Sequence, residues 1–303
     1  MSLPVHAGFW ERVWYRGFRV FCILVLAFLI LPVLVIIPLS FNAEPYFTFT
    51  RGMLTLDPDA FSLRWYLDIF ENGMTDHGLT VGSLDWFREA WNNGQWIHSA
   101  KNSIVIAVSA TLLSTVLGTL AALGLAQGAM PGQRLVMALL ISPIIVPIIV
   151  IAASTFFLFS RLGLSNTYTG IVLAHTVLGT PFVVITVTAS LSGFDSSLIR
   201  AARMLGASPP TVFFRVIMPL IMPGVLSGAL FAFGTSFDEV VVVSFLTDYE
   251  TRTIPRQMWA GIREQLSPTI LAIASILVVL SIMLLTVTEF LRRRSARMRG
   301  MTA

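Results

Sequence analysis

Six long apolar stretches constrain this chain more than any other feature of its sequence. A helix that crosses a hydrocarbon core about 30 Å thick needs about 20 apolar residues. In lipid the backbone must satisfy its own hydrogen bonds, so such stretches form helices. The sequence therefore predicts an all-α integral membrane protein with six transmembrane helices. The predicted spans are Phe18–Leu39, Ile104–Ala126, Leu135–Phe159, Tyr168–Leu191, Leu220–Phe245 and Thr269–Leu291.

The composition supports lipid as the natural solvent. The 303 residues are 55% hydrophobic and 12% charged, whereas an ordinary soluble domain has about 25% charged residues. Pro143 and Pro147 fall inside the third span, which either lines a pathway or is merely kinked. The lone cysteine, Cys22, excludes an intrachain disulfide and is interpreted as a small hydrophobe.

The arginines predict the orientation of the chain. With a cytoplasmic N-terminus, twelve basic residues fall on the inner face and eight on the outer face, mostly in long loops that carry little weight. Both termini are then cytoplasmic. The first span is interpreted as a retained anchor, because its apolar run exceeds the roughly 7–15 residues of a signal peptide. Trp10 and Trp14, mixed with Arg12 and Arg16, predict an anchoring helix on the inner surface.

This topology divides the chain into four parts. Residues 1–40 hold the N-terminal tail and the first span, and residues 291–303 form a basic cytoplasmic tail. Residues 41–101 form a long periplasmic loop that is rich in aromatic residues. We expect short interfacial helices there, with a platform for an external partner as the alternative. The remaining part, residues 98–290, carries the other five spans.

A polar loop, Ser192 to Pro219, separates the fourth and fifth spans. Asp195 or Ser196 can cap a helix in it, and Gly206 is placed to end that helix. Ser208-Pro209 is typical of a second helix start, so a short helix, Thr211 to Ile217, is expected to lead into the fifth span. Helical spacing places four apolar or small residues on one face: Leu198, Ala201, Ala202 and Leu205. Such a face either docks on a partner or lies on the membrane surface.

The same loop carries the resemblance to a known family. Arg200-Ala201-Ala202, then Gly206, then Val216-Ile217-Met218-Pro219 resembles the EAA loop of type I ABC-importer permeases. Within that family the chain is similar to the second permease of spermidine/putrescine-type importers. Further matching motifs are Asn102-Ser103, Gly118–Ala122, Ser236–Val240 and Thr253–Pro255. The resemblance covers about residues 98–290, which it marks as a type-1 ABC transmembrane domain.

The resemblance implies a permease that forms half of a translocation pathway and works by alternating access. The implied partners are two ATPase subunits, a second homologous permease and a periplasmic solute-binding protein, in a bacterial inner membrane. The residues implied to dock on the ATPase are Leu198, Arg200, Ala201, Ala202, Leu205, Gly206, Ala207 and Pro219. The family's Glu is replaced by Arg200, so the shape of the contact is kept but the family's charge contact is lost or reversed.

The chain is not expected to be an enzyme or to bind a cofactor itself. A Walker A loop needs Gly-Lys-Ser/Thr, and the single lysine, Lys101, follows Ala100. ATP and Mg would therefore reside on the partner ATPase. No metal site is expected, because the lone cysteine excludes a Cys-rich site and no second histidine lies at metal spacing from His175. No nucleic-acid partner is expected either, since the pI of about 9.7 reflects arginines at the inner face.

Acidic residues in the fifth span suggest where substrate passes. Intramembrane carboxylates usually face a cavity, so Asp238, Glu239 and Phe237 are interpreted as candidate pathway residues that suit a polyamine. The alternative places both acids at a helix end, paired with a basic group. His175, in the fourth span, is interpreted as a hydrogen-bonded packing residue.

Other functions remain open on the sequence. The importer could carry an opine, an amino-acid derivative or a phosphonate. A stand-alone secondary transporter would need coupling acids or broken helices in matching halves, and only one acidic cluster is found. A membrane enzyme would need a nucleophile and base pair, for which only His175 is available within the spans.

Overall fold

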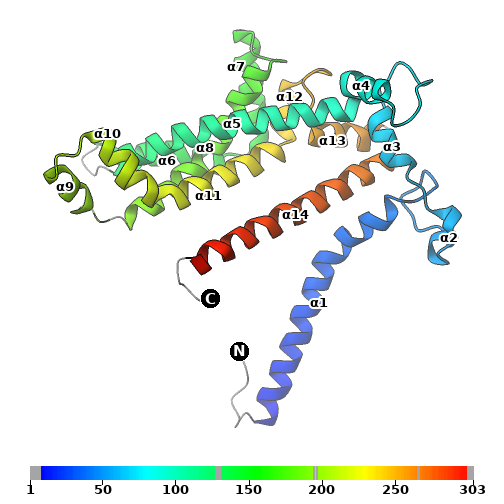
Figure 1. Cartoon of the computed structure of the whole chain (residues 1–303), viewed down its shortest axis with the longest axis horizontal. Coiled ribbons are helices and arrows are strands. Elements are labelled where there is room, and N and C mark those ends of the chain that lie inside the picture. The colour runs from blue at the N-terminus through cyan, green and yellow to red at the C-terminus, as the bar shows by residue number, and fades with distance from the viewer. Residues whose placement is uncertain (1–7, 127–130, 194, 196, 265–266, 299–303) are drawn as a thin grey trace. The chain divides into compact units, whose positions relative to one another are not determined.

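The computed structural model describes residues 8–126, 131–193, 195, 197–264 and 267–298 (Figure 1). These residues form helices and loops, and the one β-bridge among them joins Asn42 to Phe61. The elements are α1 (Phe9–Leu39), α2 (Arg51–Leu54), η1 (Pro58–Ala60), α3 (Arg64–Glu71), α4 (Leu84–Asn93), α5 (Gln95–Ala126), α6 (Gln133–Ile145), α7 (Ile148–Leu162), α8 (Tyr168–Ser192), α9 (Ser197–Met204), α10 (Pro209–Val212), η2 (Phe213–Ile217), α11 (Met218–Phe237), α12 (Val241–Leu246), α13 (Ile254–Glu264) and α14 (Thr269–Met298).

The predicted helical membrane protein is confirmed at the level of class. Among the described residues, four helices are long and apolar enough to cross a membrane, and a bent helix pair raises the number to five. The chain divides into two compact units, residues 1–72 with 261–303 and residues 73–260.

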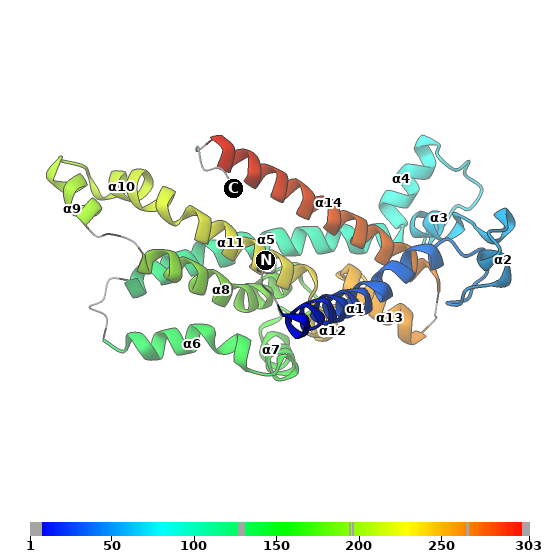
Figure 2. The same cartoon turned by 90° about the horizontal axis from the view of Figure 1, so that it is seen from below.

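The larger unit is built on three long helices, α5, α8 and α11, which pack side by side (Figure 2). Small residues allow this close approach. A Cβ added to Gly118 of α5 would lie 2.7 Å from the Cβ of Val183, and one added to Gly228 of α11 would lie 2.7 Å from the Cα of Val183. Membrane helices associate through such small-residue contacts, because lipid supplies no hydrophobic drive between helices.

The third predicted span is not one helix. Residues 133–162 form α6 and α7, which meet at an angle of 102°. Pro147 causes the break, because proline cannot donate its backbone nitrogen and excludes helical geometry from the residue before it. Val146 accordingly has ψ 133°, in the extended region.

The fifth predicted span, Leu220–Phe245, is wrong at both ends. Its helix begins at Pro209, because α10, the π-helical turn η2 and α11 form one continuous run to Phe237. The short helix predicted at Thr211–Ile217 is therefore the start of that run. At the other end the run stops before Asp238, and α12 follows as a separate helix. Val242, Val243 and Leu246 of α12 are fully buried in a core shared with α7 and α8.

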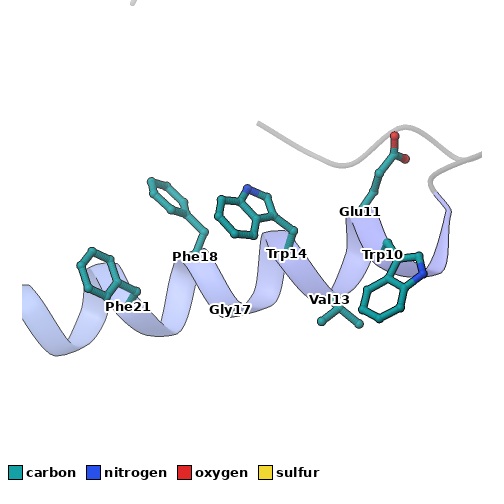
Figure 3. Close-up of a pocket in the computed structure, with 7 residues that line it drawn as sticks. All are labelled: Trp10, Glu11, Val13, Trp14, Gly17, Phe18 and Phe21. Carbon is teal, nitrogen blue, oxygen red and sulfur yellow. The ribbon is translucent and has the colours of Figure 1, made fainter.

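The smaller unit contains α1, α2, η1, α3 and α14. The predicted N-terminal surface helix is not separate, because α1 continues without interruption from Phe9 to Leu39. Figure 3 shows apolar side chains of α1 that line one pocket along the helix, among them Trp10, Trp14 and Phe18. Helical spacing puts Arg12, Arg16 and Arg19 on the opposite side, so the start of α1 is amphipathic.

Two predicted segments, the long loop after the first span and the C-terminal tail, lie partly in the smaller unit. Helices α2, α3 and η1 occupy the long loop after α1, and Thr269 Oγ1 of α14 donates a hydrogen bond to Asp68 of α3. At the C-terminus, α14 extends to Met298. Residues 299–303 of the predicted basic tail lie outside the described residues.

Candidate functional site

The predicted site residues fall in two places in the larger unit. One is the α9 loop, residues 193–208, which joins α8 to α10. The other is the α11–α12 break, residues 238–240. Figures 1 and 2 show α9 at one end of the bundle of α5, α8 and α11, and α12 toward the other end. The run from α10 through α11 connects the two places directly.

Asp195 fixes the start of α9. Its carboxylate accepts hydrogen bonds from the backbone N–H and the hydroxyl of Ser197, at 2.8 and 2.6 Å. These bonds, and to a smaller extent the positive charge of Arg200, hold the pKa of Asp195 below its ordinary value. Asp195 thus acts at the helix start, as predicted, whereas the alternative cap Ser196 lies outside the described residues.

Gly206 ends α9, as predicted. Its φ of 80° is in the left-handed region, which glycine adopts without steric cost. The N–H of Ala207 donates to the carbonyl of Ala202 at 3.1 Å, and the N–H of Gly206 donates to that of Arg203 at 3.0 Å. This pair of bonds is a Schellman motif, which satisfies the last carbonyls of the helix. Gly206 therefore occupies the position where the backbone at the end of α9 requires a left-handed residue.

The face predicted for α9 is divided in the structure. Leu198, Ala201 and Leu205 are exposed, whereas Ala202 is half-buried. Helix α9 packs against α10 and η2, and this contact gives the helix a covered side and an open side. Ala207, beyond the helix end, is also half-buried. The open side of α9 is the surface that a partner can reach.

Two apolar residues form the tip of the α9 loop. Met204 is 89% exposed and Leu205 is 88% exposed. Sequence reasoning selected Leu205 but missed Met204, although an apolar neighbour of Leu205 in a polar loop is a signal of the same kind. Phe214 of η2, 67% exposed, was also missed. Large apolar side chains that are exposed at a loop tip, as Met204 and Leu205 are, indicate a contact surface.

Exposed arginines lie on α9 and on η2, against which α9 packs. Arg200 and Arg203 of α9 and Arg215 of η2 are exposed. The segment 192–219 contains one acidic residue, Asp195. Pro219, the last residue of the predicted set, is exposed in the first turn of α11.

The α11–α12 break gives its two carboxylates different environments. Asp238 ends α11 and is exposed. Glu239 is 5% exposed, and its carboxylate accepts the backbone N–H groups of three successive residues at 2.8–3.0 Å: Val241, Val242 and Val243. Those groups are the donors that a helix start leaves without intrahelical partners. Glu239 therefore closes the start of α12, and its role as a pathway residue stays a prediction.

The other members of this cluster are aromatic or buried. Phe237 is half-buried and stacks on Phe233, with ring centroids 5.6 Å apart. His175 of α8 is fully buried, and its Nδ1 lies 2.7 Å from the hydroxyl of Ser236, so the predicted hydrogen-bonded histidine is confirmed. Its Nε2 lies 3.8 Å from a carboxylate oxygen of Glu239. The cluster joins α8 to the break.

Comparisons with known proteins agree with this architecture. Residues 114–297 match the family model described as binding-protein-dependent transport system inner membrane component. The chain is 31% identical over 275 residues to the spermidine/putrescine transport system permease protein PotC of Haemophilus influenzae, covering 91% of this chain and 96% of that protein. It is 30% identical to PotC of Escherichia coli K12, covering 88% and 90%.

Two further proteins are similar to this chain, one in sequence and one in fold. The putrescine transport system permease protein PotI of Escherichia coli K12 is 27% identical, covering 91% of this chain and 88% of that one. Among solved structures, a chain of a bacterial ABC transporter involved in the import of the acidic polysaccharide alginate aligns with a TM-score of 0.66. That alignment covers 96% of this chain and 99% of the other at 15% identity, so it bears on the fold alone.

Proposed function

Because this chain belongs to the family of binding-protein-dependent transport system inner membrane components, we propose that its α9 loop is the surface through which a partner ATPase drives it. The chain is a permease component of an ABC importer, a multi-pass inner-membrane protein and a transport subunit without catalytic activity. A permease of this kind works with an ATPase and a solute-binding protein.

The full assembly that we propose has two permeases and two ATPases. This chain contributes six spans with both termini in the cytoplasm, α14 being the sixth, and pairs with a second homologous permease. ATP and Mg reside on the ATPases, and a periplasmic solute-binding protein delivers the substrate. Closure of the ATPase pair would then move the permeases between inward-open and outward-open states as rigid bodies.

The exposed Met204–Leu205 tip is the observation that carries the docking proposal. Asp195 fixes the start of α9 and Gly206 fixes its end, and the helix presents this apolar pair where a partner can bury it. The continuous run Pro209–Phe237 then supports transmission, because its 29 residues connect the loop to the α11–α12 break as one helical run, with the π-helical turn η2 near its start and Pro223 inside it. A push on α9 would move the whole of α11.

A mild-detergent pull-down from the native membrane, followed by mass spectrometry, tests the docking proposal. We expect tagged wild-type chain to retain an ATPase and a second permease. Leu205→Ser should lose the ATPase but keep the second permease. Leu84→Ser is the matched control, because Leu84 of α4 is 86% exposed and Leu205 is 88% exposed. Equal retention by both variants would place docking elsewhere, and a chain that is active alone without ATP would support a secondary transporter.

The proposed orientation has its own test. Cys22 is the only cysteine, so Cys22→Ala gives a cysteine-free background. In intact cells a membrane-impermeant maleimide should label His77→Cys, an exposed position in the loop between α3 and α4. It should not label Arg203→Cys until the membrane is opened. The reverse labelling pattern would invert the proposed topology.

We propose a polyamine or a related organic cation as the substrate. The relatives' names and the exposed carboxylate of Asp238 support this choice, because ammonium groups are attracted to a carboxylate. The fold does not select cargo by charge, since the aligned alginate importer moves an anion. Import of an opine, an amino-acid derivative or a phosphonate is the alternative.

Competition uptake decides between these cargoes. Cells that depend on this permease should take up labelled spermidine or putrescine, and unlabelled polyamine should compete while an anionic phosphonate should not. Asp238→Asn should lower the uptake of the cation several-fold. Polyamine uptake that is unchanged when the gene is deleted would remove the polyamine proposal and leave the importer assignment intact.

A further inference from the structure

The open side of the α9 loop is cationic as well as apolar. Arg200 and Arg203 are exposed and three residues apart, and Met204 follows four residues after Arg200. Residues three or four apart on a helix are neighbours on its surface. The two guanidinium groups therefore belong to the same helix surface as the start of the apolar tip.

The single acid of this segment, Asp195, attracts Arg200 but cannot balance all the arginines of the segment. The carboxylate of Asp195 is engaged by the backbone N–H and the hydroxyl of Ser197 at the start of α9. The segment 192–219 contains Arg200, Arg203 and Arg215 against this one acid. One negative charge against three positive charges leaves the loop with a net positive charge.

We propose that the partner groove that receives α9 is acidic, with carboxylates facing Arg200 and Arg203 beside an apolar pocket for Met204 and Leu205. This inference rests on the proposed docking function. Arginine suits such a contact, because its planar guanidinium binds a carboxylate through two parallel hydrogen bonds. The apolar pair gives the contact its affinity, and the charges select an ATPase with an acidic groove over one with a basic groove.

The salt dependence of ATPase retention distinguishes the charged part of the contact from its apolar part. The tagged complex is purified from its native membrane, placed in nanodiscs and washed at rising NaCl. Because screening grows as the Debye length falls from about 10 Å at 0.1 M to about 3 Å at 1 M, we expect ATPase retention by the wild-type chain to fall at least several-fold across this range. The double variant Arg200→Glu with Arg203→Glu should retain at least ten-fold less ATPase at low salt.

The control carries the same change in total charge at other exposed arginines. Arg51 of α2 and Arg161 of α7 are both exposed, so Arg51→Glu with Arg161→Glu should leave retention and its salt dependence unchanged. A parallel measurement uses nanodiscs of neutral lipid only. If charge reversal lowers retention only in anionic nanodiscs, the arginines bind lipid headgroups and the acidic groove is overturned.

Zero-length cross-linking identifies the partner groups. Lys101 is the only lysine of the chain, so Arg203→Lys adds one cytoplasmic side-chain amine in the proposed topology. A carbodiimide should couple this amine to an aspartate or glutamate of the ATPase, which peptide mass spectrometry locates. The Arg203→Gln variant, which lacks the amine, should give no such product.

The outcomes distinguish the two proposals. If charge reversal leaves ATPase retention and its salt dependence unchanged while Leu205→Ser removes the ATPase, docking stands and the acidic groove is wrong. If Leu205→Ser also retains the ATPase, docking itself is wrong. If the Arg203→Lys amine couples to no ATPase carboxylate while the complex remains assembled, the acidic groove is likewise overturned.

Discussion

Adjacent carboxylates at the end of α11 illustrate how burial assigns roles at the scale of single residues. Asp238 is exposed, so replacing it removes a charge and little structure. Glu239 is buried and accepts three backbone N–H groups. Leaving such a donor buried and unsatisfied costs about 1–3 kcal/mol. Asp238 and Glu239 are adjacent in the sequence, but replacing each of them should therefore change the stability of the protein by clearly different amounts.

We expect Glu239→Ala to destabilise the protein by about 3 kcal/mol or more, because several buried donors lose their acceptor. Glu239→Gln should cost less, since its amide oxygen can still accept from Val241 and Val242. Asp238→Asn should change stability by less than about 0.5 kcal/mol. Thermal unfolding in detergent measures all three variants. Equal unfolding temperatures for Glu239→Ala and Asp238→Asn would contradict the capping role.

The lowered pKa of Asp195 predicts that the stability of α9 decreases at acidic pH. Its pKa is lower in the folded chain than the ordinary value of about 3.9. The stabilisation of α9 by the carboxylate is therefore fully present above about pH 4 and is lost as the pH falls through the lowered pKa. Hydrogen-exchange protection factors of the first α9 amides should fall in that acidic range. Asp195→Asn should abolish this change, and a loss of protection near pH 6 would contradict the assignment.

At the scale of elements, glycine positions determine how closely α5, α8 and α11 pack. A Cβ at Gly118 or Gly228 would lie 2.7 Å from atoms of Val183, whereas a Cβ at Gly124 or Gly234 would meet nothing within 4 Å. Gly118→Ala and Gly228→Ala should each cost about 1–3 kcal/mol by overpacking. Gly124→Ala and Gly234→Ala are the matched controls on α5 and α11. Thermal unfolding of the four variants should separate the two pairs.

The π-helical turn η2 leads to a second prediction at the scale of elements, about the effect of deleting one residue. A wide turn holds one residue more than the α-helical turn around it. Deleting Val216 should therefore convert η2 to regular helix and preserve the packing of α11. Deleting Leu226, which is 57% exposed, should instead rotate the rest of α11 by about 100°. In size-exclusion chromatography we expect the first variant to elute as a folded protein and the second to elute as aggregate. Identical elution of the two variants would show that η2 cannot accommodate the loss of one residue.

Elements differ in how far the sequence could predict them. The spans containing α5 and α8 follow from uninterrupted apolar runs, and Asp195 and Gly206 mark α9 through local capping chemistry. The run from Pro209 through α11 could not be separated from α12 by hydropathy, because α12 is as apolar as a span. Its independence depends on Glu239, whose carboxylate accepts the first N–H groups of α12, a local bond that a hydropathy pattern does not reveal. The exposure of Met204 and the partial burial of Ala202 likewise depend on how α9 packs on η2.

At the scale of the whole molecule, the chain has surfaces that it cannot cover by itself. The apolar window of α1 has no buried residue, and Met204 and Leu205 are almost fully exposed at the α9 tip. Lipid covers the first kind of surface, whereas the second needs a protein. In the proposed assembly, an ATPase covers the α9 tip and a second permease completes the pathway.

The bare α9 tip has a consequence for how cells keep subunits in balance. Copies that lack an ATPase would display Met204 and Leu205 to cytoplasmic chaperones and proteases, which bind exposed apolar segments. We therefore expect the chain's half-life to shorten when its ATPase is absent, and Leu205→Ser to lengthen it under that condition. A pulse-chase experiment measures both. The surface that couples transport to ATP would then also set how many unassembled permeases survive.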